Sequence, residues 1–240
     1  MKTEQLLILQ FIAHLLTDYT LQPPLKALEK NESGFRSKFL KWHILLAFLL
    51  SWVLSFQWLF VFGALAISIS HWLIDGLKIH LNKSRRFGKY AFFIDQGIHL
   101  VILTVVVLLY QRWFYAKPVF DFPSSTSIPA IIAVFLFCSK PANILIKEVL
   151  GVFDIRVRKT GTEETDLPNA GKLIGIVERW LIVVFILINQ FEAIGFLLAA
   201  KSIMRFKSDE SLKTEYLLTG TLLSFAIAIG AGLLILHLYL

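Results

Sequence analysis

The chain has little of what soluble proteins usually contain. It has one cysteine, Cys138, which excludes disulfides within the chain and cysteine-rich metal sites. Charged residues make up 17% and hydrophobic residues 56% of the chain, whereas soluble domains average about 25% charged and about 45–50% apolar residues. The sequence also lacks an HExxH motif, a glycine-rich phosphate loop and a serine nucleophile elbow. These absences favour an integral membrane protein and exclude several common soluble hydrolase types.

The long apolar segments predict an all-α, polytopic membrane helix bundle with about eight transmembrane helices, since one crossing needs about 20 largely apolar residues. We treat residues 1–240 as a single membrane domain, with an amino-terminal half at 1–112 and carboxyl-terminal helices at 128–240. Whether the short segment 192–206 crosses fully stays open. The expected spans are 4–22, 41–56, 58–79, 91–112, 128–149, 172–189, 192–206 and 215–238.

The basic residues indicate an orientation for the bundle. If all eight segments cross, the loops on one side together with the adjoining span ends carry 19 Lys and Arg residues, and the opposite side carries 3. The positive-inside rule then places the rich side in the cytoplasm and both termini outside it. We therefore attribute the net charge of +7 mainly to orientation, and we expect membrane lipids rather than nucleic acid as partners.

Three segments, HLLTD, HWLID and DQGIH, each place a histidine and an aspartate four residues apart. On an α-helix this spacing puts both side chains on one face, where they can hold a single cation. Chance predicts fewer than one such pair in this composition. A further histidine in KWH lies at the same predicted depth, near the cytoplasmic ends of the spans, and we expect it at the rim of the site. The candidate metal ligands are His14, Asp18, His43, His71, Asp75, Asp95 and His99.

Imidazole and carboxylate together are a typical ligand set for Zn, Mn or Fe. Seven ligands exceed what one ion needs, so the pattern fits one divalent ion or two ions bridged by an aspartate. Two alternatives stay open: the pairs hydrogen-bond between helices, or they form a route for metal ions or protons. The outer halves of the first four spans are almost wholly apolar, as in AFLLSWVLSF, which argues against a route across the membrane.

Other polar residues lie in the predicted membrane segments. Lys78 is placed to meet an anionic substrate or to extend toward lipid headgroups. In the second half, Glu178 is a candidate general base and Arg179 a candidate anion-binding residue, although Lys140 with Glu178 also fits a structural ion pair. Gly171 and Gly175 have the spacing of a small-residue packing face beside them.

As a set, the motifs AHLLTDYTLQ, KWH, HWLIDGLK, FFIDQGIHL and GKLIGIVERWLI resemble the bacterial membrane family called domain of unknown function 3307. The resemblance is strongest over residues 10–100 and again over 171–181. It supports the choice of the seven His and Asp residues and implies a location in the bacterial inner membrane. More distantly, the His/Asp pattern resembles inner-membrane proteins described as metal-dependent hydrolases.

These observations lead to three functional hypotheses. The first is a membrane-embedded, divalent-metal-dependent hydrolase that acts at the cytoplasmic side on a lipid or lipid-linked substrate. Asp75 and Glu178 would then serve catalysis, and Lys78 and Arg179 would bind the substrate. The second is a metal or proton transporter that uses the same residues. The third is a membrane scaffold with a structural polar core, which would bind a partner through loops such as FDIRVRKTGTEETDLPNAGK. The metal, the substrate and the oligomeric state stay open.

Overall fold

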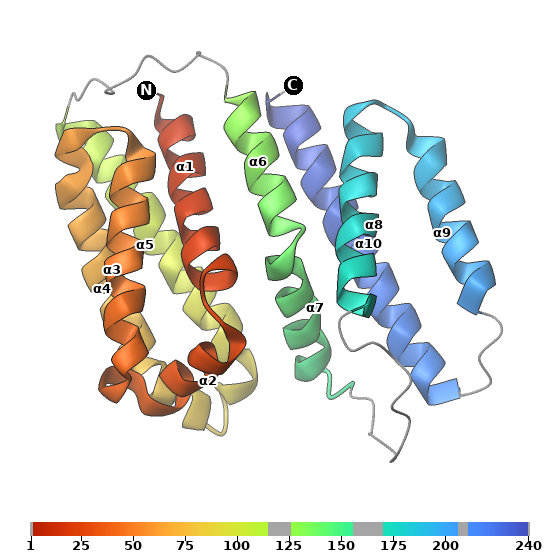
Figure 1. The fold of residues 1–240 in the computed structure, drawn as a ribbon, viewed down its shortest axis with the longest axis horizontal. Coiled ribbons are helices and arrows are strands. Elements are labelled where there is room, and N and C mark those ends of the chain that lie inside the picture. The colour runs from red at the N-terminus through yellow and green to blue at the C-terminus, as the bar shows by residue number, and fades with distance from the viewer. Residues whose placement is uncertain (1, 115–125, 156–169, 206–210, 240) are drawn as a thin grey trace. The chain divides into compact units, whose positions relative to one another are not determined.

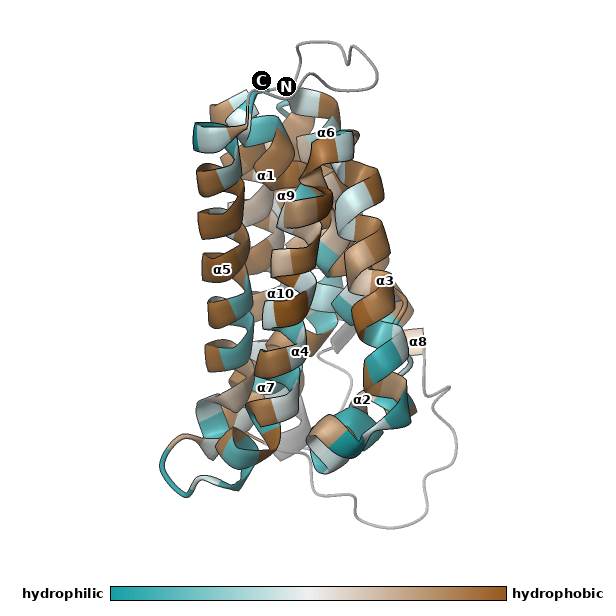
Figure 2. Cartoon of the chain, turned by 90° about the vertical axis from the view of Figure 1, so that its left-hand side faces the viewer, coloured by the Kyte–Doolittle hydropathy of each residue, from teal (hydrophilic) through white to brown (hydrophobic). Residues whose placement is uncertain are grey.

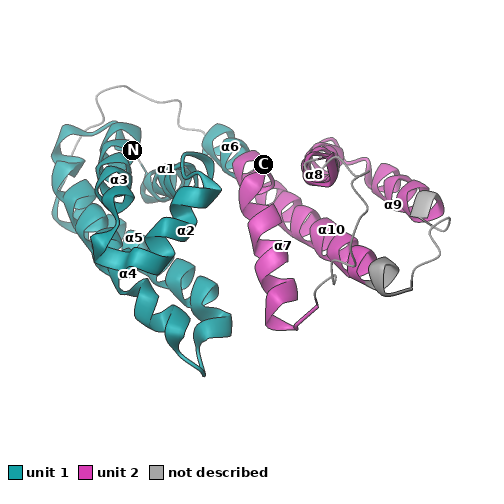
Figure 3. Cartoon of the chain, turned by 60° about the horizontal axis from the view of Figure 1, so that its bottom comes forward, with its two compact units in different colours: residues 1–133 teal, residues 134–240 magenta. Residues whose placement is uncertain are grey.

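The computed structural model describes residues 2–114, 126–155, 170–205 and 211–239, and in these ranges all regular structure is helical. The expectation of an all-α helical protein is confirmed. The chain divides into two compact units, residues 1–133 and residues 134–240 (Figure 3). The loop proposed as a scaffold surface lies mostly outside the described residues.

The amino-terminal unit is a bundle of four long helical segments that run side by side (Figure 1). α3 packs on α1 and α4, and α5 packs on α4 and α1. The shorter α2 lies at the end of the bundle where α3 begins and α4 ends. The elements are α1 Thr3–Leu15, the π-helix η1 Leu16–Thr20, α2 Pro24–Ser33, η2 Gly34–Arg36, α3 Lys38–Ser55, η3 Trp58–Phe60, α4 Val61–Lys83, η4 Gly88–Tyr90 and α5 Ala91–Trp113.

Two glycines let α2 and η2 pack closely on α4. Gly34 ends α2 with φ of +53°, and a Cβ added there would lie 2.8 Å from the carbonyl oxygen of Gly76. A Cβ added at Gly76 would lie 2.1 Å from the ring of Phe35. That ring packs edge-on against Trp72, with 4.9 Å between the ring centroids. The close packing brings α2 beside Asp75, the residue before Gly76.

The carboxyl-terminal unit is built around α10, which packs on α8 and α7, while α8 also contacts α9 and α7. Its apolar core joins Ile182 and Ile186 of α8 to Phe225 and Ala228 of α10. The elements are α6 Ser127–Phe137, which begins in the amino-terminal unit, α7 Lys140–Val152, α8 Ala170–Leu187, α9 Phe191–Arg205 and α10 Ser211–Tyr239.

Four described helices are long and apolar enough to cross a membrane, or five if the bent pair α6 and α7 is one span. They are Lys38–Ser55, Trp58–Lys83, Gly88–Trp113 and Tyr216–Tyr239. The count of eight is therefore not confirmed, because α1 and α9 have only 13 and 15 residues and α8 carries three charged side chains. Figure 2 shows apolar residues along much of α5 and mainly polar residues on α2. These features support a membrane protein.

The expected span 128–149 is not one continuous helix. α6 ends at Phe137, α7 begins at Lys140, and the two helices are bent by 48°. Pro141 explains the break, because proline lacks a backbone N–H and its ring clashes with the carbonyl four residues earlier in a continuous helix. The carbonyls at this break need other donors, and Arg179 supplies them, as described below.

Candidate metal centre

All seven predicted ligands are buried in the amino-terminal unit, with 1% to 8% of each residue exposed. They come from α1, η1, α3, α4 and α5, so the four long helical segments all contribute. Lys30 of α2 and Gln96 of α5 join them through side-chain hydrogen bonds. We call the whole set the His/Asp/Lys cluster: His14, Asp18, Lys30, His43, His71, Asp75, Lys78, Asp95, Gln96 and His99.

Asp18 lies in the π-helical turn that follows α1. The turn is marked by the hydrogen bond from the Leu21 N–H to the Leu16 carbonyl, 2.8 Å long and spanning five residues. Such turns are rare and often occur at functional sites. One carboxylate oxygen of Asp18, Oδ2, lies 3.9 Å from His14 Nδ1, and the other, Oδ1, lies 3.1 Å from His71 Nε2. The turn thus holds Asp18 between two helices.

Four ligand atoms meet at the centre of the cluster. The Nε2 atoms of His43 and His71 are 3.0 Å apart. Asp18 Oδ1 lies 3.4 Å from His43 Nε2, and Asp75 Oδ2 lies 3.3 Å from His43 Nε2 and 3.4 Å from His71 Nε2. His43 was expected at the rim, but its side chain lies in the middle, because α3 packs between α1 and α4.

These separations match those in a metal site. In a tetrahedral zinc site with bonds of about 2.0–2.1 Å, neighbouring ligand atoms lie about 3.3 Å apart. The five separations at the centre lie between 3.0 and 3.4 Å. His43, His71 and Asp75 therefore have the spacing to hold one small divalent cation, and Asp18 Oδ1 lies beside the same two imidazoles.

Two overlapping triads have the geometry to hold a metal ion. His43, His71 and Asp75 form one, and His14, Asp18 and His71 form the other, with the ligand atoms of each triad within 4.8 Å of one another. His71 belongs to both triads. It is therefore the residue whose loss would affect every arrangement of one or two ions.

Lys30 was not identified from the sequence. Its ammonium donates to Asp75 Oδ2 at 2.7 Å and contacts His43 Nε2 at 3.1 Å, and only 3% of the residue is exposed. Because an ammonium only donates, the contact with His43 requires an unprotonated Nε2, which is also the form that binds metals. Lys30 therefore lies against two of the four central ligand atoms.

Asp95 lies in a second layer that Gln96 links to the centre. Asp95 Oδ2 accepts hydrogen bonds from Lys78 Nζ at 2.7 Å and from Gln96 Nε2 at 3.1 Å. Gln96 Nε2 also lies 3.3 Å from Asp18 Oδ2. Its Oε1 accepts from the Tyr19 hydroxyl at 2.6 Å and contacts His14 Nε2 at 3.1 Å. Lys78, a predicted substrate-binding residue, is thus the ion-pair partner of Asp95.

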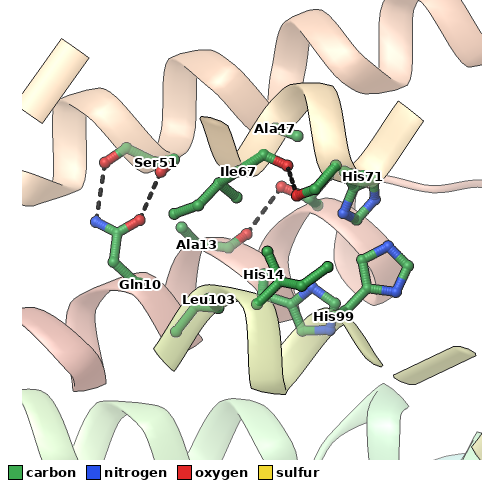
Figure 4. A pocket seen from close by; sticks show the side chains of 12 residues that line it. Gln10, Ala13, His14, Ala47, Ser51, Ile67, His71, His99 and Leu103 are labelled. Carbon is green, nitrogen blue, oxygen red and sulfur yellow. Dashed lines mark hydrogen bonds between the residues drawn. The ribbon is translucent and has the colours of Figure 1, made fainter. Parts of the chain in front are cut away.

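His99 faces a cavity beside the centre. Its Nδ1–H donates to the carbonyl of Asp95 at 2.8 Å, which leaves Nε2 as an acceptor without a hydrogen-bond partner among the described residues. Its ring lies 4.1 Å from that of His71 and 5.5 Å from that of His14, centroid to centroid. Figure 4 shows these three rings at one end of the cavity and the Gln10–Ser51 pair at the other.

The charges of the cluster favour a bound cation. Three buried carboxylates, Asp18, Asp75 and Asp95, face two ammonium groups, Lys30 and Lys78. With neutral histidines, one negative charge is left uncompensated. Since a buried unpaired charge is costly in a membrane protein, a metal ion or added protons would stabilise this arrangement.

The second predicted pair, Glu178 and Arg179, lies in the other unit. Glu178 forms an ion pair with Lys201 of α9. Arg179 donates to the carbonyls of Cys138 and Ser139. It also donates to Asn143 Oδ1 at 2.7 Å and to Ser224 Oγ at 2.9 Å.

Gly175 makes room for this guanidinium, since a Cβ there would lie 3.2 Å from Arg179 Nη1. At Gly171 a Cβ would have nothing within 4 Å. Gly175 thus leaves space for an arginine of its own helix. The expected close packing at both glycines is not seen at Gly171 among the described residues.

The fold and the cluster together define a helical membrane protein with a buried His/Asp/Lys centre in its amino-terminal unit. The model of a family described as a protein of unknown function, DUF3307, matches residues 6–123. The matched region contains every member of the cluster, and it supports the family resemblance found in the sequence motifs. No curated protein and no solved structure matches the chain.

Proposed function

We propose that the protein is a membrane-embedded, divalent-metal-dependent hydrolase whose site lies at the cytoplasmic side and acts on a lipid or lipid-linked substrate. The observation that carries the proposal is the convergence of His43 Nε2, His71 Nε2 and Asp75 Oδ2 at separations of 3.0–3.4 Å, which suit one ion, with Asp18 Oδ1 beside the two imidazoles. A divalent ion held there would polarise a substrate oxygen and ease deprotonation of a bound water near neutral pH.

Other residues of the cluster suit supporting roles. Gln96 and Tyr19 orient His14, and Asp95 orients His99 through its backbone carbonyl. Such outer partners fix ring orientation and tautomer in metal sites. Glu178 and Arg179 are not used in this proposal, because both lie in the carboxyl-terminal unit and have partners of their own there.

Transport of metal ions or protons is a second candidate, favoured by buried polar residues farther along the bundle. Gln10 Nε2 donates to the Ser51 carbonyl at 2.9 Å, and Ser51 Oγ donates to Gln10 Oε1 at 2.6 Å. Beyond them, the Tyr110 hydroxyl donates to Gln57 Oε1 at 2.9 Å. The sequence alone suggested an almost wholly apolar outer half. The apolar cluster around Leu6, Phe60 and Val107 lies in the same unit and favours a closed bundle.

Metal content and hydrolysis, measured together, test the proposal. The full chain, purified without chelators, should retain about one or two divalent ions by elemental analysis and should hydrolyse a component of a membrane-lipid panel. Asp75→Asn keeps the size of the side chain and removes its charge, so bound metal and turnover should fall together, by about tenfold or more. His71→Ala should have the larger effect because His71 belongs to both triads.

His80→Ala is the matched control, because His80 lies on the same helix as His71 and is exposed. It should leave metal content and turnover unchanged. Full metal occupancy in Asp75→Asn, or undiminished hydrolysis after exhaustive chelation, would overturn the proposal and leave the cluster as a set of interhelical hydrogen bonds.

A further inference from the structure

Lys30 is a buried cation whose side-chain acceptors belong to the proposed metal site. It reaches the centre from α2, and its ammonium lies 2.7 Å from Asp75 Oδ2 and 3.1 Å from His43 Nε2. These are the same two atoms that form a triad with His71 Nε2. The structure thus places a fixed positive charge directly beside the atoms that would bind the metal.

A bound metal ion would change the surroundings of Lys30, and this step rests on the proposed function. The ion would take the only lone pair of His43 Nε2 and would weaken Asp75 Oδ2 as an acceptor, so Lys30 would lose one of its two acceptors. A buried ammonium with too few acceptors is unfavourable. An oxyanion that bridges the metal and the ammonium would remove that cost, because its oxygens can serve both cations.

Lys78 does not share this position. Its ammonium donates to Asp95 Oδ2, which is not one of the four central ligand atoms. A metal ion at the centre would leave that ion pair in place. Of the two lysines in the cluster, Lys30 is therefore the one whose N–H groups would become available to a ligand when the metal binds.

The rest of α2 indicates where the oxyanion comes from. Leu25 and Leu28 are 81% and 55% exposed, on the helix that carries Lys30 inward. α2 also carries Lys26 and Glu29, which pair at the surface, so apolar and charged side chains share its surface. A helix of this kind is stabilised at the boundary between acyl chains and anionic headgroups.

We propose that Lys30 and the bound metal ion together bind the phosphoryl group of a membrane lipid. The phosphoryl group has several oxygens at tetrahedral angles, so one can bind the metal while another accepts from Lys30. This assigns to the site a phosphorylated lipid as its class of ligand, and it makes Lys30 a substrate-binding residue.

The test uses full-length protein in phosphatidylcholine nanodiscs that contain a minor fraction of phosphatidic acid. Mn²⁺ is loaded, its binding is measured, and the ³¹P relaxation of each lipid is recorded, because Mn²⁺ relaxes only nearby phosphorus nuclei. We expect enhanced relaxation of phosphatidic acid in wild type. Lys30→Met should still bind Mn²⁺ but bind phosphatidic acid about tenfold more weakly, the loss expected for one charge-assisted hydrogen bond.

Lys26→Met is the matched control, since Lys26 lies on the same helix but pairs with Glu29 at the surface. It should behave as wild type. If Lys30→Met does not fold, Lys30→Gln serves as the second variant, and the wild-type relaxation measurement stands by itself.

The outcomes separate this inference from the proposed function. Wild type that binds no Mn²⁺ contradicts both. Wild type that binds Mn²⁺ without relaxing the phosphatidic acid signal overturns the lipid-phosphoryl site alone. Relaxation of added inorganic phosphate but not of the lipid overturns the choice of ligand, and equal phosphatidic acid binding in wild type and Lys30→Met overturns the role of Lys30.

Discussion

The two units of the molecule bury charge in opposite ways. In the amino-terminal unit, the carboxylates and imidazoles of Asp18, His43, His71 and Asp75 point at one another, so acceptor atoms face a common point. In the carboxyl-terminal unit, the guanidinium of Arg179 points at carbonyls and side-chain oxygens of its own chain, and its donors are used there.

The difference separates a cluster with an unbalanced charge from one without. In the first arrangement Lys30 and Lys78 face three carboxylates, so with neutral histidines one negative charge is left for a further cation or for protons. An arginine surrounded by acceptors needs nothing further, so the second is complete as folded. The sequence patterns suggested a functional role for both the His/Asp/Lys cluster and the Glu178–Arg179 pair. Their hydrogen bonds in the structure distinguish the two.

The largest effect is expected for Arg179→Met. The change leaves the carbonyls of Cys138 and Ser139 without their donor at the break between α6 and α7. We expect a loss of about 3 kcal/mol or more in the free energy of unfolding, since each unsatisfied buried acceptor costs about 1–3 kcal/mol. Thermal unfolding in detergent measures it.

The neighbouring residue offers a matched control. Trp180 donates to the Phe135 carbonyl and to Ser139 Oγ at the same break, but it is much more exposed. Trp180→Phe should lower the free energy of unfolding clearly less than Arg179→Met does. The metal content of the folded fraction should be unchanged in both variants, and an Arg179→Met protein as stable as wild type would contradict the structural role.

A smaller effect is expected for Gly76→Ala. Its new methyl group would meet the ring of Phe35 in η2, and the ring must move. We expect about 1–3 kcal/mol of destabilisation. We also expect weaker lipid-phosphoryl binding, because η2 directly follows α2, which carries Lys30.

Gly97→Ala on α5 is the control. A Cβ there meets no described atom within 4 Å, and alanine favours a helix over glycine by about 1 kcal/mol. Equal stability of the two variants would show that the contact of Gly76 with Phe35 is not needed.

The smallest effect is expected when the Gln10–Ser51 pair is removed. The double variant Gln10→Leu, Ser51→Ala replaces both partners, so no side-chain acceptor is left unpaired, and stability should change by about 1 kcal/mol or less. Metal content should not change. Ion and proton flux into liposomes, compared with wild type, provides the test: wild-type flux that disappears in the double variant would favour transport over hydrolysis.

The sequence predicted the parts of the cluster that depend on helical periodicity. The i, i+4 pairs of His14 with Asp18 and of His71 with Asp75 fall on helical segments, and the bundle brings them together as such pairs would require. Pro24 begins α2, where proline is favoured at the first helical position, and Phe56 ends α3 in a left-handed conformation.

The parts that were missed depend on tertiary structure. Nothing near Lys30 distinguishes it from Lys26, since both lie in a short polar stretch, and the burial of one depends on how α2 folds back onto α4. The π-helical turn at Asp18 has no residue pattern of its own. The break before Lys140 has a signal in Pro141, because proline does not fit inside a continuous helix.

The placement of ligands on five helical segments also bears on how the protein is made. His14 and Asp18 enter the membrane first, and their partners on α4 and α5 are synthesised only some 60 to 85 residues later along the chain. Until residue 99 has left the ribosome, the early polar side chains must be tolerated by the translocon or remain near the membrane surface. Insertion of α1 should therefore be completed late, when α5 arrives and the His/Asp/Lys cluster can form.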